Sequence, residues 1–297
     1  MARASVVRLA LLALLWGSSF LWIKIAVGGL SPVQLVLARL ALGALVLLVV
    51  IRARGLRLPS SAATWQHLAV AALIANAIPY LLFAVGERTV DSGLAGALNA
   101  TTPLWAFGVG LAVRAEHRTS GRRLVGLVAG FVGALLILAP WRSGTAGSLL
   151  GALACLAAAA SYGVSYVYMG RYLTNRGLPP LVLSAAQLTA ATGLLVLATP
   201  VAGLQPVKLS GSIVAATLIL GALGTGVAYV LNYRLITDEG ATAASTVTYL
   251  LPVVSVALGI VVRGEPATWH LLVGTVIVLA GVALAQGRER HQPIARQ

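Results

Sequence analysis

Long apolar stretches alternate along the chain with short joints of turn-forming and charged residues. A helix needs about 20 apolar residues to cross the hydrocarbon core of a bilayer, and ten stretches of this sequence approach that length. They are 7–27, 32–51, 66–86, 92–113, 121–139, 147–171, 180–201, 210–234, 241–262 and 268–286. No joint between them is long enough to form a soluble domain. The pattern therefore predicts an all-α membrane protein with ten transmembrane helices.

Composition agrees with burial in lipid. Hydrophobic residues make up 59% of the chain and charged residues only 9%, whereas soluble proteins carry about 25% charged residues. The net charge of +14 would suggest nucleic acid as a partner of a soluble domain. Here the basic residues lie mostly between apolar stretches, so we interpret them as topology signals and expect the lipid bilayer, with no nucleic acid, as partner. The single cysteine, Cys155, lies inside an apolar stretch and is interpreted as a packing residue.

The distribution of lysine and arginine predicts the orientation. If the N-terminus is cytoplasmic, fifteen basic residues fall on the inside and four on the outside, namely Arg88, Arg142, Lys208 and Arg263. Positive residues collect on the cytoplasmic side of membrane proteins, so both termini are expected there, in a bacterial inner membrane. The remaining two cations, Lys24 and Arg39, lie within predicted spans.

The two halves of the chain repeat each other weakly but in the same order. Arg114-Ala115-Glu116 matches Arg263-Gly264-Glu265 at an offset of 149, which also places Pro103 on Pro252 and Tyr80 on Tyr229. The pair Trp16-Gly17 matches Tyr162-Gly163 at an offset of 146. We expect one five-helix repeat at 1–140, a second at 147–287 and a cytoplasmic tail at 288–297. An odd number of spans turns the second repeat upside down, and inverted repeats surround a midplane binding site in alternating-access transporters.

The two cations within spans are the first candidates for function. A charge inside a membrane is costly unless it is solvated or paired, so Lys24 and Arg39 predict a cationic patch on a water-filled cavity. Such a patch would attract a carboxylate or a phosphate. The alternative is structural: either cation could pair with Glu87 or Asp91 at the end of the third span, and Lys24 could extend its ammonium to the interface.

Polar and aromatic residues at helical spacing predict the rest of the cavity wall. Facing lipid would be costly for mid-span asparagines, so these helix faces should point inward. Hydrogen bonding between helices is the alternative for each of them. The complete predicted substrate-binding set is Trp16, Lys24, Arg39, Asn76, Tyr80, Asn99, Tyr162, Tyr166, Gln187, Tyr229, Asn232 and Tyr249. Three prolines within spans, Pro79, Pro103 and Pro252, are candidate hinges, although each could equally be a fixed kink.

Several of these features together resemble the drug/metabolite transporter superfamily, in its ten-helix branch with two EamA domains. The resemblance rests on Trp16-Gly17-Ser18-Ser19-Phe20, on Lys24 and Arg39, and on the Pro103 segment followed by Glu116, and it covers residues 5–286. It implies two inverted five-helix repeats around a central cavity, with the fifth and tenth helices outside the cavity as supports. It also implies export of amino acids or other metabolites.

These observations predict a secondary carrier that exports amino acids or similar small polar metabolites. None of the seven acidic residues and none of the four histidines lies in the middle of a span, so a facilitator without proton coupling is the simplest form. A multidrug, nucleotide-sugar or phosphorylated-metabolite carrier of the same fold, and a passive channel, are the alternatives. An enzyme is not expected, because no nucleophile and base share a depth, and no metal or cofactor motif occurs. Glycine faces on the fifth and tenth spans serve helix packing, within a monomer or in a weak homodimer.

Overall fold

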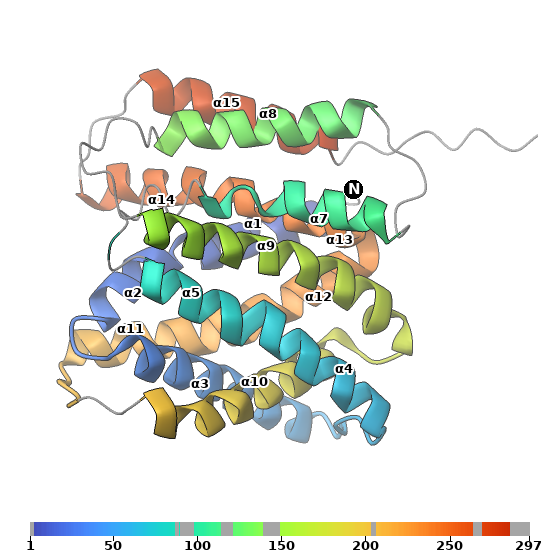
Figure 1. Ribbon diagram of the computed structural model, residues 1–297, viewed down its shortest axis with the longest axis vertical. Coiled ribbons are helices and arrows are strands. Elements are labelled where there is room, and N and C mark those ends of the chain that lie inside the picture. The colour runs from blue at the N-terminus through green and yellow to red at the C-terminus, as the bar shows by residue number, and fades with distance from the viewer. Residues whose placement is uncertain are drawn as a thin grey trace, which may run out of the picture.

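The computed structural model describes residues 3–86, 89, 98–113, 121–138, 149–202, 206–263 and 269–285, and its elements are helical. The first half contains α1 (Arg3–Gly17), α2 (Ser19–Ala26), α3 (Pro32–Ala53), α4 (Ala62–Ala72), η1 (Leu73–Ala77), α5 (Ile78–Gly86), α7 (Thr102–Ala112) and α8 (Gly121–Leu138). The second half contains α9 (Leu149–Tyr172), η3 (Thr174–Arg176), α10 (Pro180–Ala202), α11 (Gly211–Gly221), η4 (Ala222–Val227), α12 (Ala228–Glu239), α13 (Ala241–Ser245), α14 (Val247–Arg263) and α15 (Trp269–Ala285). Figure 1 shows the helices running across the molecule in broadly the same direction.

These elements confirm the predicted membrane fold of two inverted five-helix repeats. Five helical rods are long and apolar enough to cross a membrane, and shorter apolar helices accompany them. Large hydrophobic side chains lie on the outside, such as Leu150 and Leu197 with exposed fractions of 78% and 77%. An exterior of this kind is stable only against lipid tails.

The start of α3 is defined by local chemistry. The Ser31 hydroxyl accepts a hydrogen bond from the Gln34 backbone at 3.3 Å, and the Gln34 side chain accepts one from the Ser31 backbone at 2.8 Å. This reciprocal pair satisfies amide groups that a helix leaves free at its N-terminus, and Pro32 in the first turn has no amide to satisfy. The cap therefore sets where Arg39 lies along the helix, two turns below the start.

Two rods contain a wide turn that hydropathy does not predict. A π-helical turn, η1, separates α4 from α5, and η4 separates α11 from α12 at the corresponding place in the second half. Pro79 follows η1, and Pro252 lies inside α14 as expected. Pro103 differs from the prediction of a proline inside a helix, because it lies in the first turn of α7, where a missing amide costs nothing.

The inverted repeat is visible in matched contacts between the halves. A Cβ atom on Gly17 of α1 would lie 2.7 Å from the Val254 side chain of α14. Likewise, a Cβ atom on Gly163 of α9 would lie 2.8 Å from the Ala106 nitrogen of α7. Each glycine directly follows an aromatic residue, as in the repeated pair of the sequence. Both glycines are needed because the helix backbones approach closely there.

Helices α8 and α15 pack on each other as a separate layer at the edge of the molecule (Figure 1). Glycines allow the contact: a Cβ atom on Gly133 would lie 2.7 Å from the Val278 nitrogen, and one on Gly281 would lie 2.5 Å from the Gly130 nitrogen. The glycine faces predicted from the sequence are therefore used within the chain. Neither helix contributes a residue to the cavity described below.

Candidate functional site

A cavity of about 770 Å³ lies between the two halves. It begins at the loop 27–31, between α2 and α3 on the left in Figure 1, and at Pro206 and Lys208 before α11, and it reaches inward to Met169 and Asn232. Its wall includes residues of α1, α2, α3, η1, α5, α9, α12 and α14, together with Asn99 just before α7, and none of α8, α10 or α15. Its size suits a small molecule, since such sites usually measure about 300–1,000 Å³.

The mouth joins loops from both halves. The Lys208 amide donates a hydrogen bond of 3.0 Å to the Gly29 carbonyl. A Cβ atom on Gly29 would lie 1.9 Å from the Lys208 carbonyl oxygen, so only glycine fits this close approach. Lys208 thus places a cation at the entrance.

Arg39 is a buried cation on the cavity wall, and its side chain has two partners among the described residues. Only 7% of Arg39 is exposed. Its Nε donates to the Thr225 hydroxyl of η4 at 3.0 Å, and its guanidinium carbon lies 4.3 Å from the centroid of the Tyr80 ring. These contacts fix the plane of the guanidinium, and no described residue accepts a hydrogen bond from either Nη group. The two carboxylates considered as alternative partners, Glu87 and Asp91, lie outside the described residues.

Aromatic rings form much of the wall around Arg39. The Tyr162 ring lies 6.5 Å from that of Tyr80 in an edge-on arrangement and 6.1 Å from that of Phe83. Across the two halves, Trp16 meets Tyr229 edge-on at 6.3 Å. These rings make the inner part of the cavity largely apolar around the positive charge of Arg39, an arrangement suited to a ligand that has both an apolar part and an anionic group.

The wide turns hold the aromatic residues in place. A π-turn leaves a backbone carbonyl without its usual donor, and Pro79 has no amide to offer the carbonyls one turn before it. The Ala75 carbonyl accepts from the Tyr229 hydroxyl at 2.8 Å, and the Ile74 carbonyl accepts from the Ser161 hydroxyl at 2.7 Å.

The other half uses its own wide turn in the same way. In η4, the Gly224 carbonyl accepts from the Trp16 indole at 3.1 Å. Each turn therefore binds a side chain from the opposite half, and two of the three donors, Trp16 and Tyr229, lie on the cavity wall.

A buried chain of hydrogen bonds lies beside the cavity and contains three residues that we predicted in its wall, of which Tyr229 lines the cavity. Gln187 donates to the Asn76 Oδ1 at 2.7 Å, and Asn76 donates to the Tyr229 hydroxyl at 2.6 Å. The Tyr233 hydroxyl donates to Gln187. Asn76 and Gln187 are fully buried and do not line the cavity. Their side-chain amides hydrogen-bond to each other instead. We call this set, Asn76, Gln187, Tyr229 and Tyr233, the amide chain.

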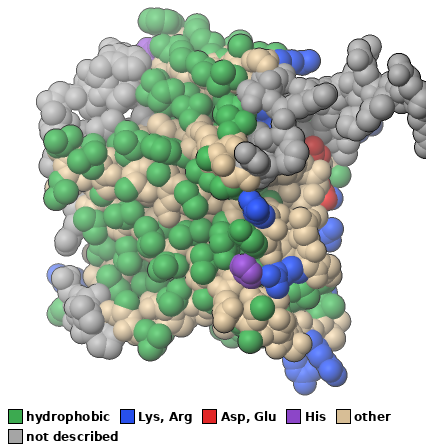
Figure 2. Space-filling view, turned by 45° about the vertical axis from the view of Figure 1, so that its right-hand side comes forward, with side chains coloured by type: hydrophobic (Ala, Val, Ile, Leu, Met, Phe, Trp, Pro, Cys, Tyr) green, Lys and Arg blue, Asp and Glu red, His purple; other side chains and the backbone are tan. Residues whose placement is uncertain are grey.

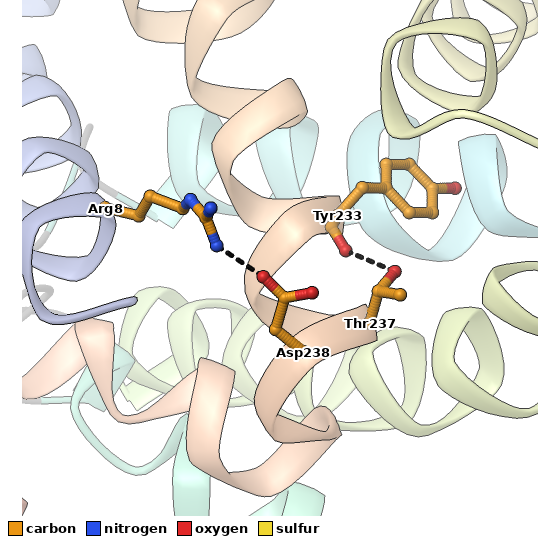
Figure 3. A network of polar contacts seen from close by, with 4 residues as sticks. All are labelled: Arg8, Tyr233, Thr237 and Asp238. Atoms are coloured by element: carbon orange, nitrogen blue, oxygen red, sulfur yellow. Dashed lines mark hydrogen bonds and ion pairs between the residues drawn. The ribbon is translucent and has the colours of Figure 1, made fainter. Parts of the chain in front are cut away.

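At the end of the molecule opposite the mouth, side-chain contacts join the two halves. Arg8 of α1 forms an ion pair with Asp238 of α12, as Figure 3 shows. On α12 the Thr237 hydroxyl donates to the Tyr233 carbonyl at 2.8 Å, one turn away (Figure 3). The His67 ring of α4 lies 2.7 Å from the Tyr168 hydroxyl of α9. Figure 2 shows Lys and Arg side chains gathered along one edge of the molecule, beside a broad hydrophobic area.

The structure brings most of the predicted residues together. Those that line the cavity are Trp16, Arg39, Tyr80, Asn99, Tyr162, Tyr166, Tyr229 and Asn232. Tyr249 does not, because its ring packs on Gly130 of α8 and its hydroxyl donates to the Leu127 carbonyl at 2.8 Å. The Lys24 side chain lies outside the described part of the structure.

Sequence reasoning did not find Phe83 or Thr225. Phe83 is apolar, so it could not be told from the lipid-facing residues of its span. A single mid-span threonine such as Thr225 is common in packed helices. Within the described ranges, no group of three or more His, Cys, Asp or Glu side chains could hold a metal ion.

Known proteins resemble this chain over nearly its whole length. The model of the EamA-like transporter family matches twice, at residues 4–139 and 149–286. The uncharacterized transporter YvbV of Bacillus subtilis is 24% identical, with 97% of this chain and 93% of that protein aligned. The uncharacterized inner membrane transporter YedA of Escherichia coli K12 is 28% identical, with 93% and 89% aligned. A protein of known crystal structure is 22% identical and superposes with a TM-score of 0.78 over 96% of this chain and 97% of its own, which shows the fold.

Proposed function

This chain belongs to the EamA-like transporter family, and we propose that it is a secondary carrier that exports amino acids or similar small polar metabolites across the bacterial inner membrane. That it is a membrane transporter rather than an enzyme follows from the family and from its relatives. The observation that carries the substrate class is Arg39, a buried cation on the cavity wall whose Nη groups have no described partner.

Arg39 favours an anionic group on the substrate. An arginine can hold a carboxylate with two parallel hydrogen bonds, and its contacts with Thr225 and Tyr80 already orient it. No Asp or Glu occurs among the described residues of the wall, so a cationic drug would find no counter-charge there. Amino acids combine a carboxylate with a small side chain and fit a cavity of about 770 Å³. Phosphorylated metabolites share the anionic group and are separated from amino acids by the experiment below.

Alternating access is supported by the cavity being open at one end and closed at the other. The excess of basic residues predicts that the closed end, with Arg8 and Asp238, is cytoplasmic. Both termini are then cytoplasmic, and the described conformation opens to the outside. A passive channel would need a continuous polar path, whereas neither Arg8 nor Asp238 at the opposite end lines the cavity.

Export without proton coupling is the simplest energetic scheme. The described wall contains no histidine or carboxylate that could carry a proton through the transport cycle. A cell that makes an excess of an amino acid supplies the outward gradient itself. We therefore propose a facilitator, with monomer as its working unit.

Flux into proteoliposomes tests the proposal. Purified protein is reconstituted, and uptake of radiolabelled amino acids, sugar nucleotides and phosphorylated sugars is measured against empty vesicles. At least one amino acid should enter until its concentrations are equal, with or without an imposed pH gradient. Arg39→Gln should lower uptake at least about tenfold, because a hydrogen-bonded charge pair is lost. Arg54→Gln, at an exposed position just after α3, should have no effect.

Two results would contradict the proposal. Uptake of phosphorylated compounds alone would exclude amino acids as the substrate class. Accumulation against a gradient that collapses with a protonophore would exclude the facilitator and would point first to Glu87.

A further inference from the structure

A second cluster of cationic and aromatic side chains lies at the end opposite the mouth, away from the cavity. The His67 ring of α4 stacks on the Tyr172 ring of α9, with the two centroids 4.9 Å apart. The Arg171 guanidinium carbon lies 5.6 Å from the centroid of the same tyrosine ring, and Arg176 of η3 donates from Nε to the Tyr172 carbonyl at 2.6 Å. We call these four residues the seam cluster. None of them lines the cavity, so substrate binding gives them no function.

The seam cluster lies where α4 of the first half meets α9 and η3 of the second half. The His67 Nδ1 lies 2.7 Å from the Tyr168 hydroxyl, and the Arg176 Nη1 donates to the Thr64 hydroxyl at 3.0 Å. Further along the same two rods, the Ser161 hydroxyl bonds to η1. The two rods therefore run antiparallel and stay in contact from the cluster inward.

The two arginines of the cluster have only neutral partners among the described residues. Arg171 donates from Nη1 to the Val113 carbonyl at 3.0 Å, and the acceptors of Arg176 are a carbonyl and a hydroxyl. No described carboxylate pairs with either of them. Both side chains are exposed, so two positive charges face outward on one seam. Guanidinium groups of this kind bind phosphate, which they hold with parallel hydrogen bonds.

The outer surface becomes apolar on both rods next to the cluster. Val70 comes three residues after His67 on α4 and is 41% exposed, and Val164 comes four residues before Tyr168 on α9 and is 40% exposed. Neither valine lines the cavity, so both face outward. Figure 2 shows the same change, with a His side chain and Lys or Arg side chains at the border of a broad hydrophobic area. A phospholipid has this order of chemistry, a phosphate followed by apolar chains.

We propose that the seam between α4 and α9 binds one anionic phospholipid, with its phosphate on Arg171 and Arg176 and an acyl chain along Val70 and Val164. A lipid with net negative charge is required, because the ammonium of a zwitterionic headgroup would bring a third positive charge to two arginines without a counter-charge. Basic pockets between membrane helices on the cytoplasmic side bind anionic headgroups, and the distribution of basic residues predicts that this end is cytoplasmic. The site is independent of the substrate that the cavity takes.

Thermal melting of the purified and delipidated full chain in detergent tests the lipid class. The additions are dioleoyl phosphatidylglycerol, dioleoyl phosphatidylcholine and inorganic phosphate at equal concentrations. Phosphatidylglycerol should raise the melting temperature by several degrees, because it binds the folded chain and not the unfolded one, whereas the other two should have little effect. An equal rise with phosphatidylcholine would overturn the requirement for an anionic headgroup. An equal rise with inorganic phosphate would overturn a lipid as the ligand.

Native mass spectrometry of the phosphatidylglycerol adduct locates the site. Arg171→Gln and Arg176→Gln should each weaken binding about fivefold, and the double variant at least about tenfold, because each removes a charge next to the phosphate. Arg122→Gln is the matched control: it removes an exposed arginine at the start of α8, predicted on the same side of the membrane, and should leave binding unchanged. Equal weakening in Arg122→Gln and Arg171→Gln would mean that the basic surface as a whole attracts the lipid, and the proposed site would be wrong.

Thr64→Val separates a contact with the lipid from a role in the fold. This change removes the hydrogen bond between Arg176 and Thr64 but keeps the arginine and its charge. The variant should melt lower than the parent in phosphatidylcholine and should bind phosphatidylglycerol within about twofold of the parent. If Thr64→Val loses as much phosphatidylglycerol affinity as Arg176→Gln, the arginine acts by holding the seam together, and its assignment to the lipid phosphate is overturned.

Discussion

Replacing Asn76 with leucine tests whether the amide chain holds the two halves together. Asn76 belongs to η1 of the first half, and its partners Gln187 and Tyr229 belong to α10 and α12 of the second half. Leucine has the branched shape and the number of side-chain heavy atoms of asparagine, but its methyl groups are bulkier and neither donate nor accept hydrogen bonds. The substitution therefore removes two buried hydrogen bonds while it keeps the shape of the side chain, and it leaves the Gln187 amide nitrogen without its acceptor.

The size of the effect follows from these contacts. Hydrogen bonds between membrane helices contribute on average about 0.6 kcal/mol each, and Asn76 makes two, of 2.6 and 2.7 Å. An orphaned buried donor adds about 1–3 kcal/mol where it finds no other partner. We expect a loss of about 1–4 kcal/mol in the free energy of unfolding, the lower end if the Gln187 amide finds another acceptor. For a protein of this size, that loss lowers the melting temperature by a few degrees, on the order of 2 to 6 °C.

Melting of purified protein in detergent, followed by tryptophan fluorescence, measures this loss. Asn175→Leu, in the exposed turn η3, is the matched control and should melt like the parent. The double variant Asn76→Leu/Tyr233→Phe should lose less than the two single variants together, because both act on the same chain through Gln187. If Asn76→Leu melts like the parent while its uptake of amino acids falls, the residue serves the ligand and our assignment of it to the fold is wrong.

Three further predictions concern the helix layer, the closed end and the orientation. Gly133→Leu should destabilise the protein by about 1–3 kcal/mol, because even a Cβ atom there would lie 2.7 Å from the α15 backbone. Thermal melting measures this loss, and an unchanged melting temperature would mean that α8 and α15 are not in contact. Asp238→Asn should raise the population of the conformation open to the cytoplasm by up to about fivefold, since a partly exposed ion pair contributes about 0–1 kcal/mol. Unchanged distances between spin labels placed on α1 and α12 on either side of this pair would refute a role of the pair in closure. A cysteine introduced at Ser210 should react with an impermeant maleimide from outside intact cells and one at Ser60 should not; the reverse would mean that the termini are outside.

Much of the fold could be predicted from the sequence because the membrane restricts the choices. A chain that must hydrogen-bond all its backbone groups inside lipid forms helices of a limited length, so hydropathy alone located the long apolar rods of the described residues. The repeated pairs Trp16-Gly17 and Tyr162-Gly163 predicted the inverted halves, and the structure explains both pairs by the same close helix contact. The wide turns η1 and η4 could not be predicted, because a π-turn keeps the same apolar composition as the helix around it.

The candidate site could be predicted in part, and Asn76 and Asn232 show why. Both are mid-span asparagines whose exposure to lipid would be costly, and the sequence places both on inward faces. Whether such a residue contacts a protein partner or a cavity depends on how its helix is rotated about its own axis and on the depth of the residue in the membrane. The sequence pattern determines neither to within one helical turn. Asn76 meets Gln187, whereas Asn232 meets the cavity. Tyr249 lies outside the lining of the described cavity for the same reason, since its hydroxyl is turned toward α8.

The wide turns also affect how the protein tolerates mutation. At Ile74, Ala75 and Gly224 the acceptor is a backbone carbonyl, which every amino acid supplies whatever its side chain. Substitutions at these three positions can therefore change the side chain and keep the bond, provided that the new side chain fits. The donors Ser161, Tyr229 and Trp16 should tolerate substitution less well, because each bond depends on their side chains. A library of variants should consequently show permissive positions in η1 and η4 directly opposite intolerant ones on α1, α9 and α12.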